Sequence, residues 1–170
     1  MTWATAGSAM FTQWPRMTMG GFGSNGYANL LTDAVKVALF NNTTAPDKDA
    51  ASTSTGFNTG QWVTGNEVTD SDGSSDWVTT GIALGSKTFT SNPGAAAGVL
   101  MFDAADTTHS NTVTITNAYG CLVYDDATTA GTGGVAKQGI TFHYFGGAQS
   151  VTTGTFTVVW HANGLFRITV

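Results

Sequence analysis

The sequence predicts an all-β protein: a single antiparallel β-sandwich of the jelly-roll or immunoglobulin-like type, preceded by an extended N-terminal arm. Runs of β-branched and aromatic residues alternate with polar residues at period two, which suits half-buried strands. Turn sequences rich in Gly, Asn, Asp and Pro separate eight or so such runs. No amphipathic pattern of ten residues or more indicates a long helix. The 170 residues are enough for one domain with a substantial core.

Residues 1–32 are expected to form the arm, and residues 33–170 the sandwich domain. Large apolar side chains of the arm are dispersed among Gly, Ser and Thr, without sustained strand or helix periodicity. Leaving them in water is unfavourable by roughly 1.5–3 kcal/mol for each one that could be buried. We therefore expect the arm to pack on its own domain or on a neighbouring molecule, and a locally packed first strand followed by a loop is the alternative. The residues predicted to form its interaction surface are Trp3, Phe11, Trp14, Met17, Met19 and Phe22.

The first half of the domain begins with a clear strand at residues 33–40. In this strand Val35, Val37 and Leu39 share one face. A long polar connection with Asx and Pro residues follows, as is typical of turns. Short strands or strand fragments are predicted at residues 61–68 and 76–84, and a pair of strands at 87–90 and 98–103 around a turn at 91–94.

The second half contains the longest predicted strands. Residues 112–125 alternate at first and then become apolar on both faces, which indicates a strand running from an exposed edge to the centre of the domain. A Gly-rich loop separates it from a strand at residues 137–146. A C-terminal hairpin is predicted from residues 155–160 and 165–170, because Asn163-Gly164 suits a tight turn.

The composition restricts the functions to consider. Charged residues make up 10% of the chain, against about 25% in an ordinary soluble domain, and the net charge is −5. Phosphate binding needs clustered basic residues, and the six Lys and Arg are scattered, so no nucleic-acid partner is expected. No apolar run predicts a membrane span, and no leader sequence is recognised, so we expect synthesis in the cytoplasm. A polar but uncharged surface suits a protein that works packed against copies or partners.

No motif predicts a cofactor, and no catalytic or metal site is expected. Asp70 and Asp72 supply oxygen atoms at the density of a calcium loop without its spacing, so a solvated turn is preferred and a bound metal stays an alternative. Asp103 and Asp106, close to His109, resemble an acid pair, although turn capping is the commoner role.

The single cysteine, Cys121, lies in the apolar run Cys121-Leu122-Val123-Tyr124. This position favours a buried small hydrophobe over a nucleophile.

Five strings of residues occur in an order that resembles a known family. They are Asp33 to Asp47 with Asn66-Glu67-Val68, Met101 to Asp106, Ala118 to Asp126, Phe142 to Gly147, and Gly154 to Val170 with its Trp-x-x-Asn-Gly core. This set is similar to a family of small structural proteins encoded by tailed bacteriophages, and it covers roughly residues 33–170. Thr107-Thr108-His109 departs from the family, whose members usually carry an aromatic residue there.

The resemblance implies a non-enzymatic virion protein, and a capsid decoration or cement protein is the first hypothesis. In this role the protein is made in the host cytoplasm and then binds the outer surface of the phage head. The expected partners are the major capsid protein, contacted through the arm, and copies of the chain itself in a trimer or other cyclic oligomer.

Two alternatives remain open at this point. A minor tail or head-fibre component would bind a host surface glycan, with Trp62, Trp77 and Trp160 as candidates for sugar stacking, although buried core tryptophans are the commoner case. A glycan hydrolase would need a close carboxylate pair, for which Asp103 and Asp106 are the nearest candidates.

Overall fold

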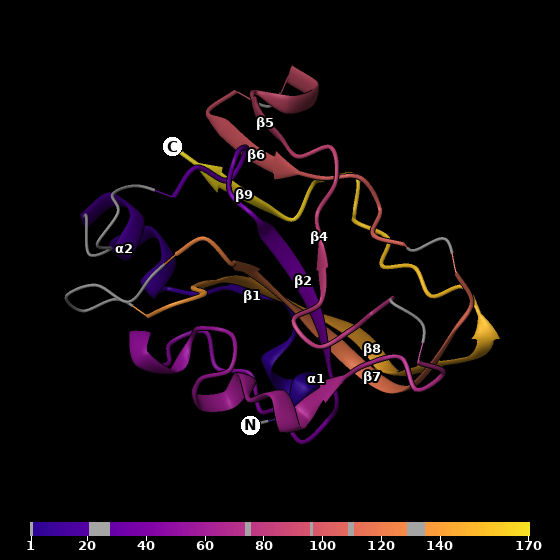
Figure 1. Cartoon of the computed structure of the whole chain (residues 1–170). Helices are drawn as coiled ribbons and strands as arrows, with labels where there is room; N and C mark the ends of the chain where they lie inside the picture. The colour runs from indigo at the N-terminus through magenta and orange to yellow at the C-terminus, as the bar shows by residue number, and fades with distance from the viewer. Residues whose placement is uncertain (1, 21–27, 74–75, 96, 109–110, 129–134) are drawn as a thin grey trace.

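The computed structural model describes residues 2–20, 28–73, 76–95, 97–108, 111–128 and 135–170. Within these ranges the chain forms two antiparallel sheets with short helices around them (Figure 1), which confirms the all-β prediction. The strands are β1 (Ala9–Met10), β2 (Val35–Phe40), β3 (Glu67–Val68), β4 (Ile82–Ala83), β5 (Thr88–Ser91), β6 (Val99–Asp103), β7 (Val113–Asp125), β8 (Gly139–Gly154) and β9 (Phe166–Thr169). The α-helices are α1 (Trp3–Ala6) and α2 (Gln13–Gly20), and 3-10 turns occur at Ser52–Ser54, Gly60–Trp62, Thr64–Asn66 and Pro93–Ala95.

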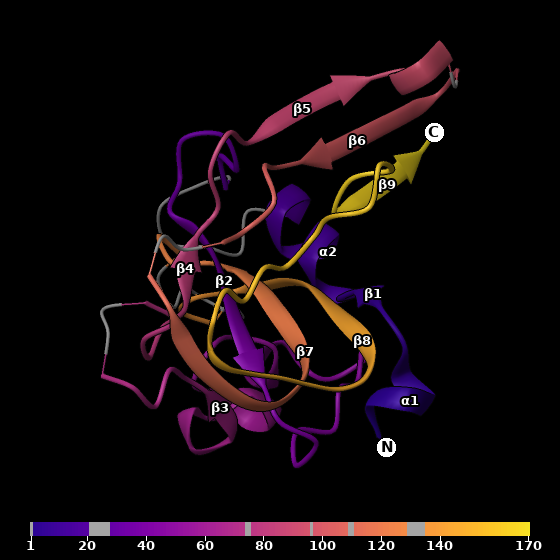
Figure 2. The ribbon, with the colours of Figure 1, turned by 90° about the vertical axis from the view of Figure 1, so that its right-hand side faces the viewer.

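The larger sheet has six strands in the order β1-β8-β7-β2-β3, with β4 also paired to β2. β2 pairs with β7 without interruption, from Val35 opposite Asp125 to Phe40 opposite Gly120. The β7–β8 register shifts at four places, and such bulges increase the local twist of a strand pair. Figure 2 shows the resulting strong curvature of β7 and β8. β7 alternates in exposure at first and is buried from residue 120 to residue 125, as its sequence predicts.

The smaller sheet has three strands in the order β5-β6-β9 and projects from one end of the molecule (Figure 2). The β5–β6 hairpin lies where the sequence predicts a strand pair, within a residue or two at each end. Phe89 lies opposite Phe102, and Phe102 lies opposite Phe166, so aromatic side chains from all three strands share one face of this sheet.

The described part of the N-terminal segment packs on its own domain. β1 pairs with β8, and Trp3 and Phe11 are fully buried. Each ring occupies a recess that a glycine creates: a Cβ atom added to Gly120 would lie 2.5 Å from the Trp3 ring, and one added to Gly139 would lie 2.7 Å from the Phe11 ring. The two glycines of β7 and β8 therefore fix where the segment docks.

An aromatic cluster between the N-terminal segment and the larger sheet forms the centre of the core. Trp62 is its central member, with ring centroids 5.0 Å from Phe40, 5.8 Å from Trp3 and 5.9 Å from Phe11, all edge to face. Edge-to-face contacts of this kind add to the stabilisation from burial.

Residues 61–68 and 76–84 contain the strand fragments that the sequence predicts, namely the two-residue strands β3 and β4 together with short 3-10 turns. Trp62 and Trp77 are buried, and each side chain anchors an irregular loop in the core. The indole N–H of Trp77 donates to the carbonyl of Phe156, 3.3 Å away.

The predicted C-terminal hairpin is wrong, because β9 pairs with β6 and not with residues 155–160. The Asn163-Gly164 turn does form, with Gly164 at a φ of 76°. However, the backbone N–H of Trp160 donates to Asp106, 2.9 Å away, and its indole N–H donates to Thr107, 3.1 Å away. These bonds hold the segment beside residues 106–107 while the chain crosses from the larger sheet to the smaller one.

Candidate functional site

Of the six arm residues predicted to form an interaction surface, the structure describes the side chains of Trp3, Phe11 and Trp14. Trp3 and Phe11 lie in the core, since the glycine recesses let their rings bury completely. Trp14 is 5% exposed and lines a groove described below. Met17 and Met19 fall within α2, and Phe22 lies outside the described residues.

The aspartates considered as metal ligands have structural partners. One oxygen of Asp70 accepts the backbone N–H groups of Asp72 and Thr114, at 3.0 and 2.8 Å. The Thr114 hydroxyl lies 2.6 Å from a carboxylate oxygen of Asp72. These bonds fasten the loop to the start of β7. In the described part of the chain, no group of three or more His, Cys, Asp or Glu side chains is placed to hold a metal ion.

Asp103 and Asp106 both accept backbone N–H groups, Asp103 from the next residue and Asp106 from a segment distant in the sequence. Asp103 accepts the backbone N–H of Ala104 at 2.9 Å, and Asp106 accepts that of Trp160 at the same distance. His109, the third member of the set considered from the sequence, lies outside the described residues.

The tryptophans considered for sugar stacking are core residues. Trp62, Trp77 and Trp160 are 0%, 1% and 8% exposed, so their rings are already covered by protein. Cys121 is fully buried, as predicted, and burial raises the pKa of its thiol.

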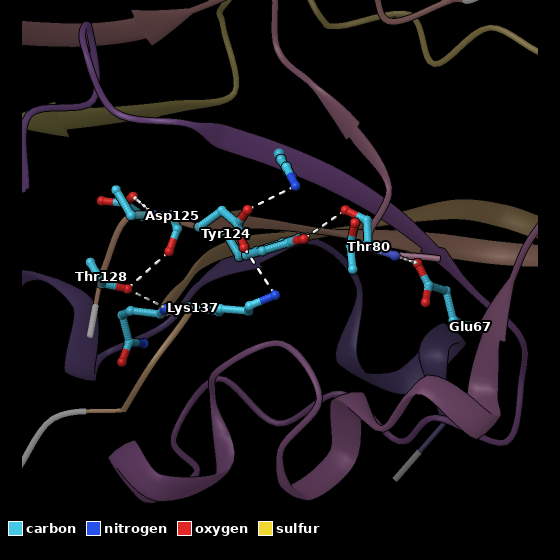
Figure 3. A network of polar contacts seen from close by, with 10 residues as sticks. Glu67, Thr80, Tyr124, Asp125, Thr128 and Lys137 are labelled. Atoms are coloured by element: carbon cyan, nitrogen blue, oxygen red, sulfur yellow. Dashed lines mark hydrogen bonds and ion pairs between the residues drawn. The ribbon is translucent and has the colours of Figure 1, made fainter. Parts of the chain in front are cut away.

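A polar network joins β3, the segment before β4 and β7 (Figure 3). The Tyr124 hydroxyl donates to the Thr80 carbonyl at 2.6 Å, and the Thr80 N–H donates to Glu67 at 2.9 Å. Burial raises the pKa of Glu67 to about 7, although amide donors from Thr80 and Gly81 oppose the shift. Burial also raises the pKa of Tyr124. Glu67 is therefore the group in this network that changes charge near neutral pH.

Two neighbouring aspartates at the end of β7 have opposite environments. Burial and the facing carboxyl of Asp33 raise the pKa of Asp125, whose other contacts include the Ala127 N–H at 3.0 Å. Burial tends to raise the pKa of Asp126 as well, but ion pairs with Lys36 at 2.7 Å and Lys137 at 3.2 Å hold it below its ordinary value. The pairs link β2 and the chain before β8 to the end of β7, which is a structural role.

A polar recess of about 390 Å³ adjoins Glu67. Its other lining residues carry hydroxyl, amide or aliphatic side chains, and they are Asn41, Val68, Thr69, Ser71, Thr114, Thr116 and Asn117. Glycoside hydrolysis needs two carboxyl groups facing each other across the substrate, and this lining contributes one. The recess does not assemble the acid pair that a hydrolase requires.

An apolar groove of about 530 Å³ lies between α2, residues 28–31 and the smaller sheet. Its lining includes Trp14, Leu30, Leu31, Phe89 and Ile168, and none of its described lining residues is charged. Leu31 and Phe89 are 48% and 37% exposed at its rim. The sequence indicates one part of the groove, because β9 has apolar residues at period two. The contribution of residues 28–31 depends on tertiary packing and has no such pattern.

None of the helices in the described ranges combines the length and the apolar character needed to cross a membrane. Comparison with known proteins finds no matching family model, no similar curated protein and no similar solved structure. The functional assignment therefore depends on the residues of this chain.

Proposed function

We propose that this protein is a non-enzymatic structural protein of a phage virion, a decoration or cement protein that binds the outer surface of the head. The observation that carries the proposal is the uncharged apolar groove beside the projecting three-stranded sheet. The ordered resemblance of residues 33–170 to phage structural proteins supports it independently.

The groove has the character of a protein-binding surface. Covering it removes Leu31 and Phe89 from water, and each gains from the loss of exposed apolar area. None of the described lining residues is charged, so covering the groove removes no lining charge from water. The expected partners are the major capsid protein and copies of this chain.

The N-terminal segment contributes to this surface in a different way from a free arm. Trp14 and Pro15 of α2 form one wall of the groove, while Trp3 and Phe11 anchor the segment in the core. Contact with the shell is thus proposed for the groove as a whole. The glycan-binding alternative is less well supported, because Trp62, Trp77 and Trp160 are buried.

Copy number in the purified virion tests the proposal. Quantitative mass spectrometry of this chain against the major shell protein should give a number comparable to that of the shell subunits. A handful of copies per particle would exclude decoration and place the protein on the tail or at a single vertex.

A binding experiment tests the surface. Purified chain is added to shells that lack it, and the bound amount is measured by sedimentation. Leu31→Asp, which places a charge at the rim of the groove, should reduce binding strongly, whereas Thr152→Asp, an exposed change on β8, should not. Equal binding by both variants would show that the groove is not the contact.

A further inference from the structure

Strand β5 is a free edge of the smaller sheet. It pairs with β6 on one side, and no described strand pairs with its other side. All four of its residues are exposed. Figures 1 and 2 both place β5 at the outer side of the projecting sheet. Such an edge presents unpaired N–H and C=O groups to any extended segment that approaches.

The other terminal strands in the two strand orders are short or include a charged residue, and β5 is neither short nor charged. The edge strands β1 and β3 of the larger sheet have two residues each, and β3 includes Glu67. β9, at the opposite edge of the smaller sheet, includes Arg167. β5 has four residues with the sequence Thr-Phe-Thr-Ser, without charge or proline. Short strands, charges and prolines are the usual protection of edges.

The nearest charge in sequence is held away from the edge. The Lys87 ammonium group donates a hydrogen bond to the backbone carbonyl of Asp33, in the segment that precedes β2. It therefore points toward the body of the domain and does not oppose the approach of another strand to β5.

One side chain of β5, that of Phe89, also lines the apolar groove. Phe89 faces the groove and shares its rim with Leu31, whereas Thr88 and Thr90 lie on the other face of the sheet. A strand added beside β5 would therefore satisfy the backbone groups of the edge and also cover exposed apolar area at Phe89.

We propose that β5 pairs antiparallel with β5 of a second copy of this chain, forming a two-fold dimer through one continuous sheet. The uncharged sequence can lie opposite itself without like charges meeting, and cross-strand pairs of aromatic and β-branched residues are favourable. A two-fold axis through the edge makes the strands antiparallel, as are all the strand pairs of the described sheets.

Symmetry restricts the register of this pairing. Directly opposite residues of an antiparallel pair lie on the same face of the sheet, and a two-fold axis perpendicular to the sheet preserves faces. The axis must therefore pass beside a residue and not between two residues. Either Phe89 lies opposite Phe89 of the second copy, or Thr90 lies opposite Thr90.

The dimer is expected to be weak in free solution. A pair of four-residue strands is smaller than a standard interface, which buries about 800 Å² on each partner. Copies held side by side on a shell would pair more strongly because their effective concentration is high. The inference rests on the self-association that the proposed function includes, but not on binding to a shell.

Sedimentation equilibrium of the full chain, from about 1 μM to about 1 mM, tests the pairing across the range expected for weak interfaces. The native chain should show a monomer–dimer equilibrium. Thr90→Lys brings like charges within about 8 Å in either register and should raise the Kd about fivefold or more. Thr169→Lys, the same change at the β9 edge, is the matched control and should leave the Kd unchanged.

Cysteine crosslinking identifies the contact directly. Cys121 is the single native cysteine and is fully buried, so an introduced cysteine provides the accessible thiol. Opposite residues have the Cα separation that a disulfide requires, so either Phe89→Cys or Thr90→Cys should give a covalent dimer under mild oxidation, and Thr169→Cys should not.

Three results would overturn the inference: a strictly monomeric chain at the highest concentration, a dimer that Thr90→Lys does not weaken, or crosslinking at Thr169 in place of β5. A monomer that is nevertheless abundant in virions would refute the β5 pairing and leave decoration intact. A dimer that is present at only a handful of copies per virion would support the β5 pairing and refute decoration.

Discussion

Replacement of Trp3 by alanine tests whether the N-terminal segment belongs to the core. Trp3 is 0% exposed, its ring lies in the recess at Gly120, and its indole N–H donates to the carbonyl of Asn41 at 2.9 Å. A segment that served mainly as a contact arm for another molecule would contribute little to the stability of the isolated chain.

The expected cost of Trp3→Ala is large. Truncation of a buried aromatic side chain to alanine typically destabilises a domain by about 3–5 kcal/mol, because both the transfer free energy and the packing around the cavity are lost. For a chain of this size, that corresponds to a Tm lower by about 6–20 °C. The lost indole hydrogen bond falls within the same range and is not added to it.

Urea unfolding followed by circular dichroism and by tryptophan fluorescence measures the effect. The midpoint should fall with little change in the slope, and both signals should change together. Val159→Ala, at a side chain that is 70% exposed, is the control and should change the free energy of unfolding by less than about 0.5 kcal/mol. A loss below about 1 kcal/mol for Trp3→Ala would refute the assignment of the segment to the core.

Three further predictions concern other parts of the core and the polar network. Gly139→Ala would place its Cβ 2.7 Å from the Phe11 ring, so it should lower the Tm and increase amide hydrogen exchange in β1. Folded Glu67 keeps its proton up to about pH 7, whereas its ordinary pKa is 4.5, so stability should fall as the pH rises through this window. Glu67→Gln should flatten that fall in unfolding curves measured at several pH values; an unchanged slope would show that another group titrates. Asp126→Asn removes a carboxylate whose pKa is held low, so it should cost about 1 kcal/mol at neutral pH and progressively less as the pH falls below the ordinary Asp value.

The sequence predicts those strands whose local pattern of apolar and polar residues matches their burial in the structure. β7 is the clearest example, since its alternation followed by a doubly apolar run corresponds to a strand that enters the centre of the larger sheet. The β5–β6 hairpin is predicted from the turn residues at 91–94 between its two strands. In both cases local pattern and tertiary burial agree.

Partners distant in the sequence account for what the sequence does not predict. Residues 155–160 alternate like a strand, but hydrogen bonds from Trp160 to Asp106 and Thr107 place them at the transition between the sheets. The recesses that receive Trp3 and Phe11 depend on glycines more than a hundred residues away in the chain, and a lone glycine in a strand has many explanations. The groove likewise combines α2, residues 28–31 and β9, which no local pattern relates.

The pairing of β1 with β8 has a consequence for synthesis of the protein. Ala9 lies opposite Phe142, so β1 cannot pair until β8, more than a hundred residues later in the chain, has been synthesised. Until then Trp3 and Phe11 have no recess to occupy and remain available for incorrect contacts. Folding of this domain is thus expected to finish after translation and to be slow for its size, as its long-range contacts imply. Nascent chains arrested before residue 139 should be protease-sensitive and bound by chaperones, whereas the released chain should not.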